Sequence, residues 1–199
     1  MDDVQAQVNV DEIFSLYEKF GSSDYIGEPV SQIEHMCQAA QLAIDEDFDE
    51  EVILAAFFHD IGHLCEQMFH VNYMDGYGVV DHENIGGQYL RQKGFSEKIA
   101  RLVESHVQAK RYLTFKNPDY YNKLSEASKI TLVKQGGVMD EIEAQHFEMD
   151  HLHPLYIKLR EWDDKAKTEQ IPLPSLENFK KMAYDHLMKE ERKEEKRET

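Results

Sequence analysis

One apolar stretch most limits how this chain can fold. Residues 52–67 read VILAAFFHDIGHLCEQ, and their apolar half contains the helix formers leucine and alanine, which predicts a buried helix. The same run contains His59, Asp60 and, one helical turn later, His63. Burying an imidazole beside a carboxylate costs free energy unless the two groups pair or bind an ion. The stretch therefore suggests a metal site on a helix, although a His-Asp pair alone is a weak indication.

Helical periodicity recurs along the rest of the chain, whereas strand patterns are scarce. Apolar stripes and capping residues predict helices over residues 10–20, 30–45, 52–67, about 82–93, from 96 past 110, 124–133, from 154 past 163, and 175–190. Residues 68–80 have no clear period, and the Asn117-Pro118 pair predicts a turn. We expect an all-α bundle in a single domain over residues 1–199, with its core at about 10–188 and a charged tail at 189–199.

The charge balance narrows the choice of partners. With 39 acidic against 22 basic residues, the formal net charge is -17, so nucleic acid and anionic membranes should be repelled. The N-terminus lacks the features of a signal peptide, and no apolar run approaches the ~20 residues that span a bilayer. We expect a cytoplasmic protein in which Cys37 and Cys65 are reduced packing residues, and we infer no obligatory protein partner.

Five of the ten histidines fall on or at the start of predicted helices, beside apolar residues. Any one of them could be an ordinary core histidine, but five buried titratable rings would need five separate compensating partners. A shared metal site would supply that compensation together. The five are His35, His59, His63, His82 and His106. The histidines in polar surroundings, to which we assign no role, are His70, His146, His151, His153 and His186.

The order of acidic and imidazole residues resembles the ligand pattern of the HD-domain superfamily, most of whose members are metal-dependent phosphohydrolases built as helical bundles. The superfamily pattern consists of His35, the pair His59 and Asp60, and Asp163, and this chain adds His82 and His106 between the pair and the late aspartate. This enlarged set is similar to that of the mixed-valence di-iron oxygenases, closest to the glycine-forming dioxygenases of 2-amino-1-hydroxyethylphosphonate and more distantly to myo-inositol oxygenase. The resemblance extends from about residue 24 to 182 through the segments DYIGE, SQIEH, LAAFFHDIGH, GYGVVDHE, ESHVQAKRYL, LVKQGGVMDE and REWDDKAK.

The resemblance implies a cofactor of two iron ions in the Fe(II)/Fe(III) state. It assigns the ligands as His35, His59 and Asp163 on one iron, His82 and His106 on the other, and Asp60 as the bridge. Imidazole and carboxylate suit iron, and so few ligands leave positions for substrate and dioxygen. With two aspartates, the mixed-valence cluster keeps a charge of about +3, which suits an anionic substrate.

Polar residues near the implied ligands form a candidate substrate shell. His63 and Lys110 each follow a ligand by one helical turn, so both should point towards the metals and offer donors to an anion. The alternatives are a histidine that only supports a ligand and a surface lysine. Ser128, Thr131 and Gln135 form a polar stripe that could equally be a solvent-exposed face. The resemblance assigns this stripe, together with Lys110 and His63, to the phosphonate.

The loop before residue 35 completes the expected shell. The resemblance implies that Tyr25 occupies an iron position until substrate arrives and that Glu28 meets the substrate's ammonium group. It further implies that 2-amino-1-hydroxyethylphosphonate and O2 react to give glycine and phosphate. In that reaction the catalytic residues are Asp60, His63 and Lys110.

Three other functions remain open from the sequence. The substrate could be the trimethylammonio analogue, which gives glycine betaine, since Tyr25, Tyr73 and Tyr77 could enclose a quaternary ammonium. A metal-dependent phosphohydrolase is a second alternative, which His82 and His106 disfavour. A non-catalytic metal-binding domain is the third, and the intact ligand set argues against it.

Overall fold

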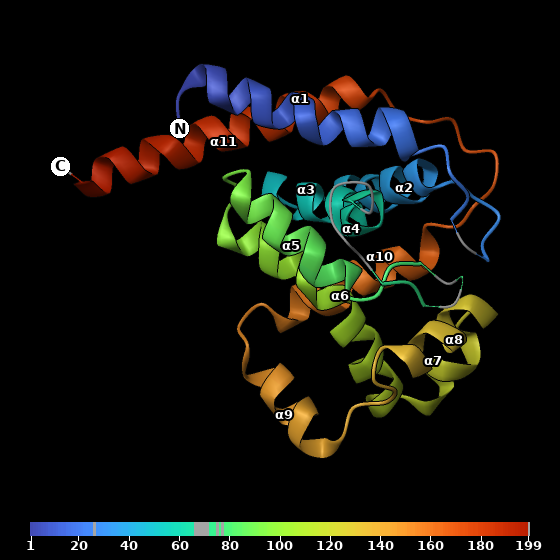
Figure 1. Ribbon diagram of the computed structural model, residues 1–199. Coiled ribbons are helices and arrows are strands. Elements are labelled where there is room, and N and C mark those ends of the chain that lie inside the picture. Colours follow the sequence, from blue (N-terminus) through green and yellow to red (C-terminus); the bar gives the residue numbers. More distant parts are fainter. Residues whose placement is uncertain (26, 66–71, 75, 77, 199) are drawn as a thin grey trace.

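The computed structural model of the chain describes residues 1–25, 27–65, 72–74, 76 and 78–198 (Figure 1). Within these ranges it contains helices and two isolated bridge pairs but no strand, which confirms the predicted all-α fold. The helices are α1 (Asp3–Phe20), α2 (Gln32–Asp45), α3 (Glu50–Phe58), α4 (Ile61–Leu64), α5 (His82–Gln92), α6 (Glu97–Lys116), α7 (Pro118–Lys123), α8 (Glu126–Lys134), α9 (Glu141–Met149), α10 (His153–Lys165) and α11 (Leu176–Glu198).

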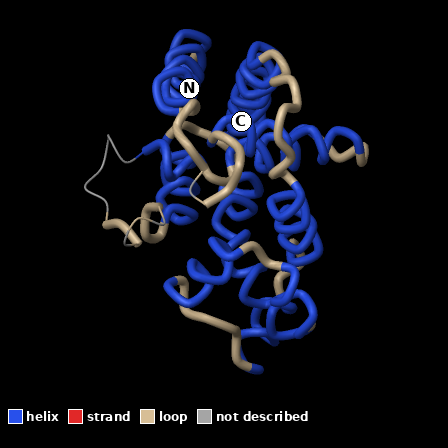
Figure 2. Tube along the Cα trace, turned by 90° about the vertical axis from the view of Figure 1, so that its right-hand side faces the viewer, coloured by secondary structure: helices blue, strands red, loops and turns tan. Residues whose placement is uncertain are grey.

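The bundle is built around α3, whose residues from Val52 to Phe58 are all buried. Helices α2, α6, α10 and α11 pack against it, and α1 and α11 lie side by side along one side of the bundle (Figures 1 and 2). The ring of Phe57 stacks on Tyr17 of α1 at 4.6 Å and on Phe179 of α11 at 4.4 Å. Burying such a ring stabilises the fold by roughly 2–3 kcal/mol, so these contacts tie both outer helices to α3.

The shorter helices α7, α8 and α9 extend from the far end of α6, away from α1 and α11 (Figure 1). Their position places α8 beside the C-terminal half of α6, next to the site described below. Cys37 and Cys65 are buried free thiols, as expected for packing residues. Among the helices that the structure describes, none is long and apolar enough to cross a membrane.

The predicted continuous helix over residues 52–67 is wrong, because the chain breaks at His59 and Asp60. Helix α3 ends at Phe58, and Asp60 has φ −106° and ψ 13° before the short α4 begins. The carboxylate of Asp60 makes no capping hydrogen bond to α4 and points instead into the interior of the bundle. The break therefore turns both polar side chains away from the helix axis and towards the other histidines. Residues 66–67, the end of the predicted helix, lie outside the described ranges.

Other boundaries differ from the prediction in instructive ways. Helix α9 was not predicted, although Asp140 and Glu143 form a capping box at its start, and α7 replaces the expected turn after Asn117. Helix α11 continues to Glu198, so the charged tail extends the last helix. His186 is buried against the ring of Phe95 rather than in polar surroundings. Helix α5 ends shortly before Gly94, and α6 begins directly after its N-cap Ser96, as the sequence predicts.

Gly62 lies at a close contact between α4 and α5, and its replacement should be costly. A Cβ atom at this position would lie 1.9 Å from the carbonyl oxygen of His82, so two stretches of backbone would have to separate. We expect Gly62→Ala to destabilise the fold by on the order of 3 kcal/mol, despite alanine's higher helix propensity. In thermal unfolding this corresponds to a Tm lowered by roughly 10 °C.

Gly87→Ala is the matched control for that substitution. Gly87 is also a buried helical glycine, but the nearest atoms that its Cβ would meet belong to the side chain of Glu104. That side chain can shift at the cost of its partly exposed ion pair with Arg91. A Tm that falls equally in both variants would contradict the importance of the α4–α5 contact.

Candidate metal centre

Four buried histidines are oriented by hydrogen bonds to main-chain carbonyl groups. A neutral imidazole that donates its Nδ1–H to a carbonyl keeps a lone pair on Nε2, which is the arrangement found in metal-binding histidines. The four Nδ1–O distances are 2.9 Å for His35 to Ala166, 2.8 Å for His59 to Ala56, 3.3 Å for His82 to Val79 and 2.8 Å for His106 to Val103. In their neutral form, all four rings therefore present Nε2 to the interior of the site as an electron-pair donor.

These Nε2 atoms meet in two close pairs. The distance is 3.0 Å between His35 and His59 and 2.9 Å between His82 and His106. Two lone pairs at this separation repel each other unless a cation or proton lies between them. Metal–nitrogen bonds of about 2.1 Å place two ligands about 3.0 Å apart at a right angle and about 3.4 Å apart in a tetrahedron. Both pairs fit adjacent ligands at a right angle.

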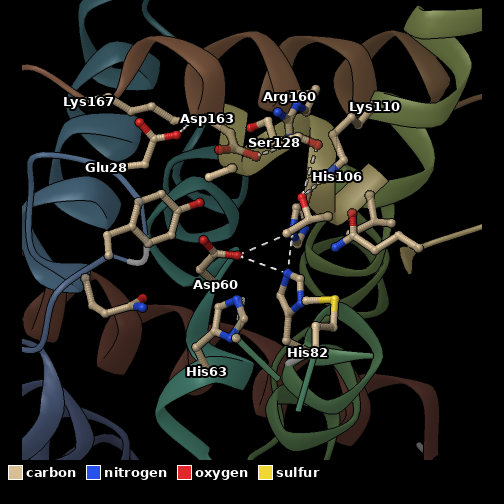
Figure 3. Close-up of a pocket in the computed structure, with 18 residues that line it drawn as sticks. Glu28, Asp60, His63, His82, His106, Lys110, Ser128, Arg160, Asp163 and Lys167 are labelled. Atoms are coloured by element: carbon tan, nitrogen blue, oxygen red, sulfur yellow. Dashed lines mark hydrogen bonds and ion pairs between the residues drawn. The ribbon is translucent and has the colours of Figure 1, made fainter. Parts of the chain in front are cut away.

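Asp60 lies between the two pairs and presents a different oxygen to each; Figure 3 shows its contacts with His82 and His106. Its Oδ2 is 3.5 Å from Nε2 of His35 and 3.4 Å from Nε2 of His59. Its Oδ1 is 3.2 Å from Nε2 of His82 and 3.3 Å from Nε2 of His106. A carboxylate that addresses two donor pairs in this way is placed to bridge two metal ions.

Asp163 completes the set from α10. Its Oδ2 accepts a hydrogen bond from Nη1 of Arg160 at 2.7 Å, and its Oδ1 lies 3.4 Å from Nε2 of His35. Oδ1 of Asp163 and Oδ2 of Asp60 are both buried without a hydrogen-bond partner, a costly condition that a bound cation would relieve. The donor atoms form two groups, His35 with His59 and Asp163, and Asp60 with His82 and His106, each within 4.8 Å. All six predicted ligands are thus brought together.

The local charges also favour a cation at this position. Burial would raise the pKa of Asp60, but the electrostatic interaction with His59 and the contacts with His106 and His35 hold it well below its ordinary value. Burial would lower the pKa of His35, but contacts with Asp163 and Asp60 raise it to about 9. A donor set of imidazole nitrogen and carboxylate oxygen suits iron and other first-row transition metals.

A pocket opens onto the Asp60 side of these groups (Figure 3). All the residues predicted to form the substrate shell line it: Tyr25, Glu28, His63, Lys110, Ser128, Thr131 and Gln135. His35 and His59 are fully buried and are not among the residues that line the pocket. The lining also contains three polar residues that the sequence analysis missed, namely Gln32, Arg160 and Lys167. Of these, Arg160 lies one helical turn before Asp163, a spacing that could have identified it.

Lys110 places a buried amine, which a bound anion would hold in its charged form, at one end of the pocket. The residue is 3% exposed and its Nζ donates a hydrogen bond to Oγ1 of Thr131 at 2.9 Å. In the described part of the chain, no carboxylate lies within ion-pair distance of that nitrogen. Burial, together with repulsion from Arg160, lowers the pKa of Lys110 to about 7. A bound anion would supply the missing counter-charge.

His63 faces the pocket although the helix that was expected to place it is broken. Its ring stacks on that of His82 with centroids 4.0 Å apart, and its Nδ1 accepts a hydrogen bond from the backbone N–H of Val79 at 3.2 Å. Burial and the charge of His82 lower the pKa of His63 well below its ordinary value. A neutral ring with an accepting Nδ1 carries its proton on Nε2, so His63 can donate a hydrogen bond.

Glu28 lies on the side of the pocket away from Lys110 (Figure 3), and Tyr25 also lines the pocket. The ring of Tyr25 stacks on that of His35 with centroids 4.0 Å apart. Oε1 of Glu28, expected to meet an ammonium group, already accepts hydrogen bonds from Nζ of Lys167 at 2.7 Å and Oγ of Ser125 at 2.6 Å.

Tyr77, considered above for an aromatic cage, lies outside the described residues. So does His70, to which no role was assigned. Tyr73, also considered for the cage, is 57% exposed and lines a neighbouring cavity. Of the two considered tyrosines that the structure describes, Tyr25 lines the pocket and Tyr73 does not.

The sequence of this chain is similar to a known domain family and to several known proteins. The family model of the HD domain matches residues 33–145. An uncharacterised protein of Acanthamoeba polyphaga mimivirus is 44% identical over 179 residues, which cover 90% of this chain and 82% of that protein. The [1-hydroxy-2-(trimethylamino)ethyl]phosphonate dioxygenase (glycine-betaine-forming) of Leisingera caerulea is 38% identical over 87% of each chain. The hydroxymethylphosphonate dioxygenase of Gimesia maris is 38% identical over 85% of this chain and 84% of that enzyme.

Proposed function

The chain belongs to the HD-domain family, and within it we propose a di-iron dioxygenase that cleaves the C–P bond of a 1-hydroxyphosphonate. The observation that carries this proposal is the position of Asp60, whose two oxygens face two separate histidine pairs. The buried cation of Lys110 in the adjoining pocket supports an anionic substrate. The names of two relatives, both phosphonate dioxygenases, support the reaction class.

The first substrate to test is 2-amino-1-hydroxyethylphosphonate. With one O2 it gives glycine and phosphate, and both oxygen atoms are retained in the two products. One iron would be held by His35, His59 and Asp163 and the other by His82 and His106, with Asp60 shared. When bound, the two irons supply the Lewis acidity and the redox equivalents that dioxygen chemistry requires.

The protein's own groups position and neutralise the substrate. Lys110, with the hydroxyl groups of Thr131 and Ser128 nearby, binds the phosphonate and then holds the departing phosphate. The Nε2–H of His63 donates a hydrogen bond to an oxygen of the substrate. Tyr25 covers His35 and limits the access of water to that side of the site. Together these contacts hold the C1–H bond in one orientation in a dry pocket.

The substituent on the second carbon distinguishes the alternatives. The relative from Leisingera caerulea supports the trimethylammonio analogue, which would give glycine betaine. The relative from Gimesia maris supports hydroxymethylphosphonate, which has no second carbon. A phosphate monoester is the substrate expected if the HD domain of this chain instead acts as a phosphohydrolase.

A comparison of aerobic and anaerobic phosphate release tests the proposal. The iron-loaded protein should consume O2 and release phosphate from a 1-hydroxyphosphonate in a ratio of one to one, and release none without O2. The protein should contain two irons per chain by elemental analysis. A phosphate monoester assayed in parallel is the control, and phosphate release that persists without O2 would favour the hydrolase instead.

A further inference from the structure

We propose that Lys167 determines which substituent the pocket accepts, by competing with a cationic group of the substrate for Glu28. The inference rests on the proposed function and deepens it. It concerns the relative affinity of the site for 1-hydroxyphosphonates with and without an ammonium group. A residue of this kind acts on selectivity, so its effect should differ between two substrates that share the same reacting centre.

The position of the Glu28–Lys167 pair is the first observation. Lys167 donates to Oε1 of Glu28 at 2.7 Å, and their side chains are 15% and 8% exposed. Both residues line the pocket, on the side opposite Lys110, with Asp60 and Asp163 between (Figure 3). A substrate whose phosphonate lies at Lys110 and whose hydroxyl group lies beside Asp60 therefore directs its remaining substituent towards this pair.

The second observation is that Lys167 is anchored at its backbone. It follows Ala166, whose carbonyl oxygen accepts the hydrogen bond from Nδ1 of His35, and its own N–H donates to the carbonyl of Lys165 at 2.8 Å. Its Nζ also lies 5.9 Å from the ring centroid of Tyr25. The backbone is thus fixed by the metal centre, and only the side chain of Lys167 is free to leave Glu28.

The charges then decide which substrates fit. A substrate without a cationic group leaves the Glu28–Lys167 pair intact. An ammonium group brings a second cation to a carboxylate that is already neutralised, so either Lys167 or the substrate loses its partner in a mostly buried pocket. Like charges brought together in such a place are unfavourable. The native lysine therefore weakens the binding of ammonium-bearing substrates and leaves hydroxymethylphosphonate unaffected.

Lys167→Met tests this inference, because methionine keeps most of the side chain's length without its charge. We expect the affinity for 2-amino-1-hydroxyethylphosphonate, relative to hydroxymethylphosphonate, to rise by about tenfold. The affinities are measured by calorimetry on the iron-loaded protein without O2. In turnover, the same ratio should change through KM and not through kcat. Lys165→Met, at an exposed lysine outside the pocket, should leave the ratio unchanged.

A second pair of variants separates competition from other roles. In a Glu28→Gln background, the Lys167 substitution should raise the ratio much less, because no carboxylate is left to compete for and only the repulsion between the two cations remains. An unchanged ratio in Lys167→Met, or equal loss of both ligands, would overturn the inference. If Lys167→Met loses iron or unfolds, Lys167→Gln gives the same comparison. Binding without phosphate release in the wild type would contradict the proposed function alone, and failure of every phosphonate to bind would contradict both.

Discussion

Replacing Asp60 with alanine is expected to remove both metal ions rather than one. Each of its carboxylate oxygens lies within 3.5 Å of two histidine Nε2 atoms, so one substitution deprives both donor groups of an anionic ligand. The chain itself should still fold. Removing a carboxylate that is buried without a full set of hydrogen bonds also removes its desolvation cost. Elemental analysis of folded protein should therefore find less than about one-tenth of the wild-type iron, in line with the 10–100-fold effects of weaker perturbations at metal sites.

Two neighbouring aspartates provide graded controls. Asp163 faces only the His35 side of the centre, so Asp163→Ala should lose one metal and retain part of the other. Asp164 instead forms an ion pair with Arg160 and accepts a hydrogen bond from the hydroxyl group of Tyr120, so Asp164→Asn should retain both. Full iron occupancy in Asp60→Ala would contradict the bridging position of this carboxylate.

Lys110→Met is expected to change activity and stability in opposite directions. The ammonium group is buried and donates a hydrogen bond to the neutral hydroxyl group of Thr131, and among the described residues it has no carboxylate within ion-pair distance. An apolar side chain of similar length should therefore raise the free energy of unfolding of the substrate-free protein. Loss of the charge that faces the phosphonate should lower kcat/KM by on the order of 100-fold to 1000-fold, largely through KM. The iron content should stay at the wild-type level.

Thermal unfolding, steady-state kinetics and elemental analysis of one preparation would test all three parts of that prediction. Lys129→Met is the matched control, because Lys129 lies on α8 and pairs with Glu126 near the surface. It should change neither KM nor iron content. A normal KM for the phosphonate in Lys110→Met would show that the anion binds elsewhere.

The sequence predicted the identity of the site residues better than the backbone that positions them. The order of histidines and aspartates predicted that α5, α6 and α10 contribute to one site. The residues Gly94 and Ser96 predicted where α5 ends and α6 begins. The break between α3 and α4 had only a weak local signal in Gly62, because no proline stands near His59 and Asp60 and the apolar run continues on both sides of them. That break is imposed by tertiary packing, through contacts such as the one between Gly62 and the backbone of His82.

Pairings between distant residues were also out of reach. Glu28 and Lys167 are far apart in the chain, and neither position has a local pattern that indicates an ion pair. Helix α9 is a different case, since the residues of its capping box, Asp140 and Glu143, were present to be read. Its single buried residue, Ala144, left no apolar stripe for a periodicity argument to detect.

The way the four imidazoles are held has a consequence for how such enzymes diverge. Their Nδ1 atoms rest on carbonyl groups of the polypeptide itself, and a carbonyl is present whichever amino acid occupies the position. Substitutions on the side of the pocket opposite Lys110, at positions such as Glu28 or Lys167, therefore leave the ligand geometry intact. The same metal ligands can therefore serve different substrates in different family members. A new specificity can arise by a single substitution without passing through an inactive variant.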